Sequence, residues 1–276
     1  MKTLKDRVAV ITGAGSGIGR ATALALAHEG CHLALSDIDQ DSLAETADLL
    51  GQVPVRVHTQ VLDVSDRQAM QDYPNTVKAA LGLVNLVINN AGTTIAATVE
   101  EHTIEDYEWL MGINFWGVVY GTKFFMPHLQ EVDEAHIVNI SSIFGCIGVR
   151  NQSAYNATKF AVRGFTESLK QELHRSHIGV SCVHPGGVKT KIIEKSRFKS
   201  VPGVHDHADL TQKFAAMAKT SSAQAAAVIV KGIRAKQERI LIGSDARFLD
   251  ILVRMMPSSY PKFLRRVEKL LLGAPS

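Results

Sequence analysis

Hydrophobic residues form short apolar runs that alternate with amphipathic stretches between residues 8 and 242. Short apolar runs bounded by turn residues are typical of buried strands, whereas apolar residues spaced three and four apart predict helices. The runs predict strands over residues 7–12, 32–36, 55–62, 84–89, 136–140, 179–184 and 239–242. The spacing predicts helices over residues 17–29, 40–50, 67–80, 104–125, 153–174 and 222–236.

This alternation predicts an α/β fold, a doubly wound parallel sheet of about seven strands with helices on both faces, in the Rossmann-like manner. We expect one catalytic domain over residues 1–245, because no linker, repeat or low-complexity stretch interrupts the pattern. Ligands of such sheets bind beyond the carboxyl ends of the strands. Candidate functional residues should therefore follow the strands.

Residues 246–276 continue with a different pattern, which predicts a C-terminal helical extension packed on the domain. Two amphipathic helices are expected on either side of the segment from Pro257 to Pro261. Their apolar positions are Phe248, Leu249, Ile251, Leu252, Met255 and Met256, then Phe263, Leu264, Val267, Leu270 and Leu271. From Arg247 onward the sequence contains six Arg and Lys residues and two acidic residues, which gives a net charge of about +4. Cover of the pocket or of a subunit interface is favoured over contact with an anionic membrane surface.

Composition excludes several classes of protein. The chain has 276 residues, 46% of them hydrophobic and 21% charged, and a net charge of +3 that is too small to indicate a nucleic-acid partner. Cys31, Cys146 and Cys182 are too few and too scattered for a disulfide framework or a metal site. The first strand begins near Val8, so no signal peptide is expected, and no apolar run is long enough for a membrane span. We expect a cytoplasmic protein.

A glycine-rich turn follows the first predicted strand and opens the first predicted helix. The common dinucleotide pattern G-x-G-x-x-G fails, because Ile18 occupies its last position, and no Gly-Lys-Ser/Thr of a phosphate loop follows. Thr12, Gly13, Gly17 and Gly19 fit T-G-x-x-x-G-x-G instead. Backbone N–H groups and a helix N-terminus at such a turn favour a bound phosphate.

A tyrosine and a lysine lie four residues apart, at Tyr155 and Lys159, and therefore share one face of the predicted helix. Such pairs are often plain surface neighbours. Here the ammonium would favour the phenolate and lower a tyrosine pKa that starts near ~10. Ser142, which follows a predicted strand, could hold a substrate oxygen, although a serine there can also simply end a strand.

Taken in order, these motifs make residues 5 to 245 resemble the short-chain dehydrogenase/reductase family, in its single-domain form. The resemblance implies an NAD(P)-dependent oxidoreductase without a metal, with Asn114, Ser142, Tyr155 and Lys159 as catalytic residues. The cofactor-binding residues that it implies are Gly13, Ser16, Gly17, Ile18, Gly19, Asp37, Asp63, Val64, Asn90, Ala91, Gly92, Tyr155, Lys159, Pro185, Gly186, Val188 and Thr190.

The resemblance also implies a role for each catalytic residue. Tyr155 is the general acid/base, and Ser142 donates to the substrate oxygen. Lys159 holds the nicotinamide ribose and lowers the Tyr155 pKa, while Asn114 holds a water beside it. Val188 contacts the carboxamide of the cofactor through its backbone.

Two aspartates bear on the choice of cofactor. Asp37 lies 18 residues beyond Gly19, where a carboxylate can accept hydrogen bonds from an adenosine ribose and repel a 2′-phosphate, so NAD is preferred over NADP. The alternative is a helix cap, a role for which Asp39 is equally suited. Asp63 resembles the family's adenine contact, or caps the helix that follows Asp66.

The sequence therefore predicts hydride transfer between NAD(H) and a secondary alcohol/ketone pair by a homodimer or homotetramer. Apolar residues after Ser142 and Thr190 suggest an apolar substrate, although ordinary packing explains them nearly as well. They are Ile143, Phe144, Ile147, Val149, Ile192, Ile193, Phe198 and Val201. A non-catalytic cofactor-binding regulator and a nucleotide-sugar epimerase or dehydratase remain as alternatives.

Overall fold

The computed structural model describes residues 1–199 and 206–272, and the side chains of residues 1–199 and 206–266. The predicted pocket residue Val201 and the tail side chains of Val267, Leu270 and Leu271 lie outside the described residues. At the centre is a seven-stranded sheet in which every neighbouring pair is parallel, in the order β11-β7-β6-β4-β1-β2-β3. Its strands are β1 Val8–Thr12, β2 His32–Asp37, β3 Val57–Val61, β4 Leu86–Asn89, β6 Ala135–Ile140, β7 Ile178–Pro185 and β11 Arg239–Ile242.

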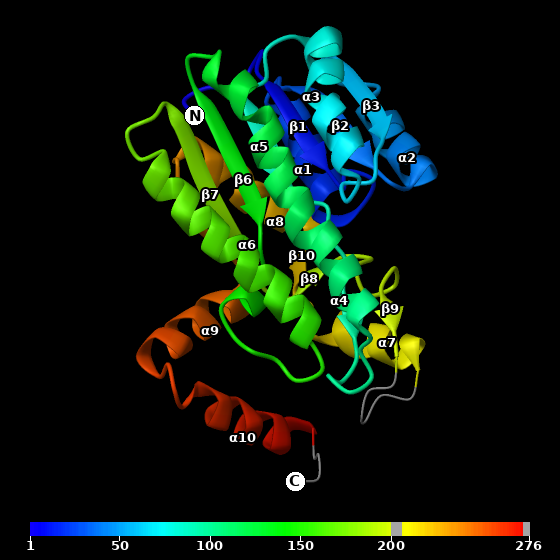
Figure 1. Ribbon diagram of the computed structural model, residues 1–276, viewed down its shortest axis with the longest axis vertical. Helices are drawn as coiled ribbons and strands as arrows, with labels where there is room; N and C mark the ends of the chain where they lie inside the picture. The colour runs from blue at the N-terminus through cyan, green and yellow to red at the C-terminus, as the bar shows by residue number, and fades with distance from the viewer. Residues whose placement is uncertain (200–205, 273–276) are drawn as a thin grey trace.

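Helices cover both faces of this sheet (Figure 1). One core lies between the sheet and helices α1 Gly17–His28, α2 Gln40–Leu50 and α8 Ser222–Arg234. The other core lies between the sheet and α3 Arg67–Leu81, α5 Gly117–Gln130 and α6 Ser153–Glu172. The predicted α/β fold, a parallel sheet of about seven strands with two helical layers, is confirmed.

The order of the strands reverses at β1, whose neighbours are β2 and β4. The loops after β1 and β4 therefore leave the sheet toward opposite faces, which opens a crevice at the carboxyl ends of the strands. Two short parallel pairs lie outside the main sheet: β5 Ile95–Ala96 with β9 Arg197–Phe198, and β8 Val188–Lys189 with β10 Thr220–Ser221.

The single helix predicted over residues 104–125 is wrong in its middle. Helix α4 Ile104–Met111 passes through a π-helical turn at Gly112–Trp116 before it continues as α5 to Gln130. A π turn accommodates one extra residue. Here it turns Asn114 inward, where the amide bonds to Thr93 and Thr158, and no hydrophobic spacing signals such a turn.

Other differences are smaller. Strand β3 begins at Val57 rather than at residue 55, because the segment before it forms turns. The helix α7 His207–Met217 and the 3-10 turn η2 Ile143–Gly145 were not predicted. No residue of α7 is buried, which explains its weak hydrophobic pattern.

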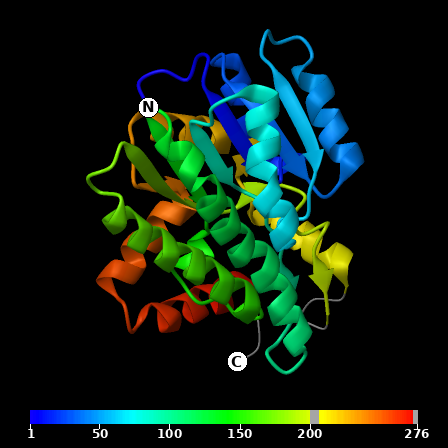
Figure 2. The ribbon, with the colours of Figure 1, turned by 45° about the horizontal axis from the view of Figure 1, so that its top comes forward.

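The C-terminal extension forms two helices, α9 Ser244–Met255 and α10 Tyr260–Leu272. The boundary predicted at residue 245 thus falls within the first turn of α9. Ala246 is fully buried against Ile143 and Cys146 of the η2 region, and the Tyr260 hydroxyl accepts a hydrogen bond of 3.0 Å from the Gly148 N–H. Both helices lie at one end of the molecule in both views (Figure 1, Figure 2). Among the described residues, no helix is long and apolar enough to cross a membrane.

Candidate active site

A cavity of about 1340 Å³ opens at the carboxyl ends of the strands. It brings together residues from the glycine turn, the ends of five other strands and helix α6. Of the predicted site residues, those that line it are Gly13, Ser16, Gly17, Ile18, Asp37, Asp63, Val64, Asn90, Ala91, Gly92, Ser142, Tyr155, Lys159, Pro185, Gly186, Val188 and Thr190. Gly19 and Asn114 are absent from this lining.

The glycine turn requires glycine for two separate reasons. Gly13 and Gly17 adopt φ angles of +65° and +55°, in the left-handed region that other residues rarely adopt. Gly19 lies so close to the turn that a Cβ atom would come within 2.1 Å of the Gly13 carbonyl oxygen. The turn therefore stays tight where α1 begins, and a helix N-terminus of this kind can bind a phosphate.

Asn90 ties this turn to the end of β4. Its side-chain amide donates to the carbonyl oxygens of Thr12 and Gly13, at 2.9 and 3.0 Å. The Thr12 hydroxyl accepts hydrogen bonds from the backbone N–H groups of Asn90 and Ala91, both at 3.1 Å. The two loops on either side of the crevice are thus held as one unit.

The carboxylates that follow β2 and β3 separate into caps and cavity residues. Asp39 caps α2 by accepting from the Ser42 N–H, and Asp66 caps α3 by accepting from Gln68 and Ala69. The alternative reading of Asp37 and Asp63 as helix caps is therefore wrong. Asp37 instead accepts from the Gly15 and Asp39 N–H groups, at 2.8 and 3.0 Å.

Tyr155 and Ser142 are placed by the contact between α6 and the loop after β6. Asn156, next to the tyrosine, donates to the carbonyl oxygens of Phe144 and Ile147, both at 2.6 Å, and accepts from the Val149 N–H. Because this buried amide holds the loop at three points, the Ser142 hydroxyl and the Tyr155 phenol stay at the same end of the cavity.

Lys159 is only 3% exposed, and its ammonium donates to the Ile140 carbonyl oxygen at 3.1 Å. A Cβ atom on Gly92 would lie 3.3 Å from this ammonium and 3.1 Å from the Asn114 side-chain oxygen. Gly92 thus leaves room for the lysine beside the amide. Asn114 is fully buried, accepts from the Thr93 N–H and donates to the Thr93 carbonyl and the Thr158 hydroxyl.

Burial controls the protonation of the pair. Desolvation raises the pKa of Tyr155 to about 12, and hydrogen bonding with Ser142 opposes the rise. Desolvation lowers the pKa of Lys159 to about 8. We expect Lys159 to lower the tyrosine pKa together with the positive charge of the oxidised cofactor, and in the protein alone the effect of burial is larger. The physical reason is that both groups lose hydration and the ammonium points at the Ile140 carbonyl oxygen.

The segment after Thr190 contributes residues that the sequence did not single out for these roles. Lys195 reaches across the adenosine side and pairs with Asp39 at 2.6 Å, and Lys199 forms an ion pair with Asp106. Arg197 stacks on the Trp109 ring with its guanidinium carbon 3.7 Å from the ring centre. Sequence separations of about 90 to 160 residues leave no local signal for such pairs.

Many apolar side chains line the part of the cavity near Ser142 and Tyr155. Trp109, Ile113, Phe214, Met217 and Leu249 join residues that the sequence had indicated. The indicated residues found in the lining are Ile143, Phe144, Val149, Ile192 and Ile193, whereas Ile147 is buried elsewhere and Phe198 does not line the cavity.

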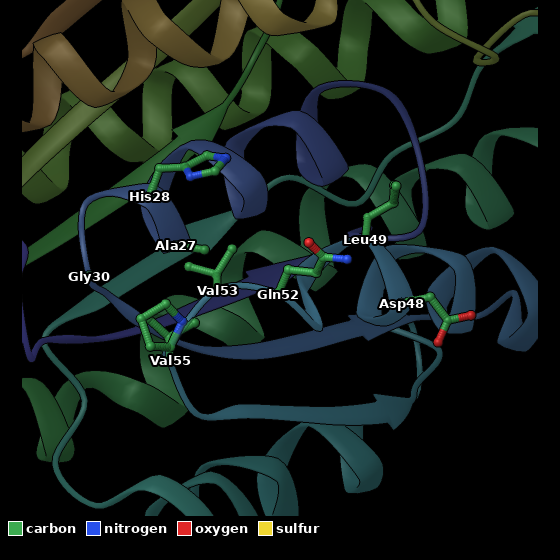
Figure 3. Close-up of a pocket in the computed structure, with 9 residues that line it drawn as sticks. Ala27, His28, Gly30, Asp48, Leu49, Gln52, Val53 and Val55 are labelled. Carbon is green, nitrogen blue, oxygen red and sulfur yellow. The ribbon is translucent and has the colours of Figure 1, made fainter.

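A second cavity, of about 620 Å³, lies between the end of α1 and the loop after α2 (Figure 3). Its lining includes His28, Leu49 and Val53, and none of the predicted site residues. Within the part of the chain that the structure describes, no group of three or more His, Cys, Asp or Glu side chains could hold a metal ion.

Comparison with known proteins places the chain in a family. The family model for short chain dehydrogenases matches residues 7–200. SadH of Mycobacterium tuberculosis is 45% identical over 267 residues, covering 96% of both proteins. A short-chain dehydrogenase/reductase from Burkholderia phymatum, solved with NAD, is 31% identical, with a TM-score of 0.85 over 93% of this chain and 95% of that one. Levodione reductase is 28% identical, with a TM-score of 0.79 over 88% and 98%. The chain belongs to the short-chain dehydrogenase/reductase family of oxidoreductases.

Proposed function

We propose that this protein transfers hydride between NAD(H) and an apolar secondary alcohol/ketone pair, with Tyr155 as general acid/base. The observation that carries the proposal is the convergence of Ser142, Tyr155 and Lys159 with the glycine turn in one cavity. A non-catalytic regulator needs no such convergence.

The residues present fit a dinucleotide. The turn from Gly13 to Gly17 presents backbone to a pyrophosphate, and the cavity of about 1340 Å³ exceeds the ~300–1,000 Å³ of common ligand pockets, as a cofactor together with a substrate requires. Pro185, Gly186 and Val188 face the nicotinamide end. The bound nicotinamide supplies the hydride chemistry.

The protein residues handle the proton. In oxidation, Tyr155 takes the proton of the substrate hydroxyl as the carbinol carbon gives up its hydride, and in reduction it returns that proton. Ser142 donates to the substrate oxygen as negative charge develops there. Lys159 lies behind the tyrosine on the same face of α6, where it binds ribose hydroxyls and favours the phenolate. The proton then leaves toward Asn114.

NAD is the preferred cofactor in this proposal. The Asp37 carboxylate lines the adenosine side, and Ile38 beside it is 67% exposed and uncharged. The nearby cation Lys195 is already neutralised by Asp39. A 2′-phosphate would therefore meet negative charge without a free cation among these residues. The related Burkholderia phymatum structure contains NAD, in support of this preference.

The decisive experiment measures reduction of NAD and NADP with a panel of secondary alcohols that differ in apolar size. We expect NAD reduction with bulky apolar alcohols and weak activity with small polar ones. A protein that binds NAD and reduces none of it, and that also fails to reduce ketones with NADH, would leave the regulator alternative.

We also propose a homo-oligomer whose interface lies on α5 and α6. Trp116, Tyr120 and Phe124 stack in one row along the π turn and α5, with ring centroids 5.7 Å apart, and Trp116 is 47% exposed. Phe160 on α6 is 42% exposed. Aromatic rows of this kind favour a buried contact with a second subunit. A change in molecular mass on Trp116→Ser tests this assignment.

A further inference from the structure

The outward side of α9 is apolar although nothing in the described chain covers it. Phe248, Ile251 and Met255 are 54%, 57% and 78% exposed, and their spacing of three and four residues places them on one stripe of the helix. The opposite side of α9 is occupied, because Ala246 is fully buried and Leu249 lines the active-site cavity. The exposed stripe therefore plays no part in packing the tail against the domain.

The same two helices carry exposed basic residues. Arg247, Lys262, Arg265 and Arg266 are exposed and have no ion-pair partner among the described residues. The buried carboxylate Asp250 is already occupied by Arg239 and Arg254. The exposed part of the tail thus combines large apolar side chains with four basic residues that have no ion-pair partner among the described side chains.

We propose that α9 and the first turns of α10 bind the surface of an anionic lipid bilayer. Phe248, Ile251 and Met255 enter the boundary between headgroups and acyl chains, while Lys262, Arg265 and Arg266 contact the anionic headgroups. A second copy of the chain is the weaker occupant. A two-fold contact on this face would bring two copies of the same basic residues into one interface. The aromatic row on α5 already offers a separate face for self-association.

The position of the tail gives this contact a consequence for the substrate. Leu249 lines the cavity from the inner side of the same helix whose outer side meets the bilayer, and Tyr260 is bonded to the loop after Ser142 through the Gly148 N–H. An apolar alcohol dissolved in the bilayer would reach the cavity close to where the tail is bound. This consequence rests on the proposed function, whereas the membrane contact does not.

The full-length protein is to be sedimented with vesicles of phosphatidylcholine alone and with vesicles in which about a third of the lipid is phosphatidylglycerol. We expect sedimentation only with the anionic vesicles and release by high salt. Each basic residue at the surface contributes roughly fivefold in affinity. The variant Lys262→Gln/Arg265→Gln/Arg266→Gln should therefore bind about 100-fold more weakly.

The matched control changes three exposed basic residues that lie on other helices or loops, away from the tail: Arg67→Gln/Arg175→Gln/Lys231→Gln. Its binding should stay within about twofold of the unmodified protein. A second variant, Phe248→Ser/Ile251→Ser/Met255→Ser, keeps the charges and should also lose binding, with an unchanged circular dichroism spectrum and unchanged molecular mass.

Three outcomes would overturn the proposal. They are equal sedimentation with both kinds of vesicle, equal loss in the control variant, and a drop in oligomer mass in the apolar variant, which would assign the stripe to a self-interface. Activity on the bulky apolar alcohols of the panel, measured in buffer without vesicles, separates the two proposals. Its absence defeats the proposed function and leaves the vesicle result intact.

Discussion

The Lys159 ammonium lies 5.6 Å from the centre of the Tyr155 ring. It is close enough to act on the phenolate by charge, yet its hydrogen bond goes to the carbonyl oxygen of Ile140. In the protein without a cofactor, burial raises the pKa of Tyr155 to about 12. We infer that the tyrosine becomes an effective base only when further positive charge arrives with the oxidised cofactor.

This inference predicts the titration of Tyr155. A raised pKa means that the neutral phenol persists as the pH rises, so Tyr155 should remain protonated at pH 10 in the protein alone. Ultraviolet difference titration of the unmodified protein against Tyr155→Phe isolates its signal. We expect no tyrosinate from Tyr155 below about pH 11, and a transition at lower pH once NAD is present. Ionisation near pH 10 without NAD would contradict the effect of burial.

The Tyr155→Phe variant also tests the role in catalysis. It removes the hydroxyl and keeps the ring that packs edge to face against Phe144, with centroids 6.1 Å apart. We expect turnover to fall by about 10²–10⁴ with little change in the Kd for NADH. Lys159→Ala is the companion variant, and it should impair both quantities because the lysine has two roles. If Lys159→Ala changes turnover alone, the assigned ribose contact is wrong.

Asp37 and Ile38 should determine the choice between NAD and NADP. Replacing both, as Asp37→Ser/Ile38→Arg, removes the repelling carboxylate and adds a cation, so the ratio of kcat/KM for NAD over NADP should fall by tenfold or more. Ile38→Arg alone is the control and should change the ratio less, since Asp37 remains. Equal use of NAD and NADP by the unmodified protein would refute the role of Asp37.

Asp250 should anchor the C-terminal extension. Its carboxylate is 6% exposed and binds Arg239 and Arg254, while the Arg239 guanidinium also donates to the Cys146 sulfur. Asp250→Asn leaves Arg239 with only the more distant carboxylate of Glu167, at 3.7 Å, and should lower the free energy of unfolding by about 2 kcal/mol. Arg254→Gln, which removes the exposed partner, should cost less than about 1 kcal/mol. Urea unfolding measures the loss of free energy in both variants. Similar losses would show that the buried pair of Asp250 and Arg239 contributes no more than the exposed partner Arg254.

Buried histidines should make the protein sensitive to acid. Burial, the N-terminal ammonium of Met1 and the charge of Lys236 lower the pKa of His136 to about 3. The folded state keeps this ring neutral while the unfolded chain takes up a proton near pH 6.5, so stability is lost as the pH falls below that value. Between pH 7 and pH 5 the loss is about 2 kcal/mol for such a histidine.

The measurement compares urea unfolding at pH 7 and pH 5. The unmodified protein should lose about 2 kcal/mol more over this interval than His136→Gln. The exposed residue His28 supplies the control, because His28→Gln should keep the full loss. If His136→Gln also loses the full amount of unfolding free energy between pH 7 and pH 5, His136 is not the source of the acid sensitivity.

The repeating part of the fold could be predicted from the sequence because it depends on local patterns. Apolar runs such as Val8 to Thr12 must be buried, and the glycine turn after them allows only a few backbone conformations. The cavity residues on those strand ends followed from the topology of parallel sheets. The orientation of the Lys159 ammonium could not be predicted, because it depends on a carbonyl group 19 residues away.

Long-range pairs and helix irregularities had no signal of this kind. The contact between Lys195 and Asp39 depends on how a loop folds back over 156 residues of sequence. Asn114 was assigned to the site through a resemblance, and its π turn arises from tertiary bonds to Thr93 and Thr158. The local spacing of residues predicts neither the Lys195–Asp39 contact nor the π turn.

The π turn at Gly112–Trp116 also fixes how far α5 is rotated about the helix axis relative to α4. One added residue rotates everything after it by about 100°. Trp109, before the turn, faces the substrate end, whereas Gly117 and Gly121, after it, press against Val64 and Asn89 of the cofactor side. Chain length at this point is thus as constrained as residue identity. A substitution at Trp109 changes one wall of the pocket. Loss of a single residue within the turn would instead misalign α4 and α5 at once.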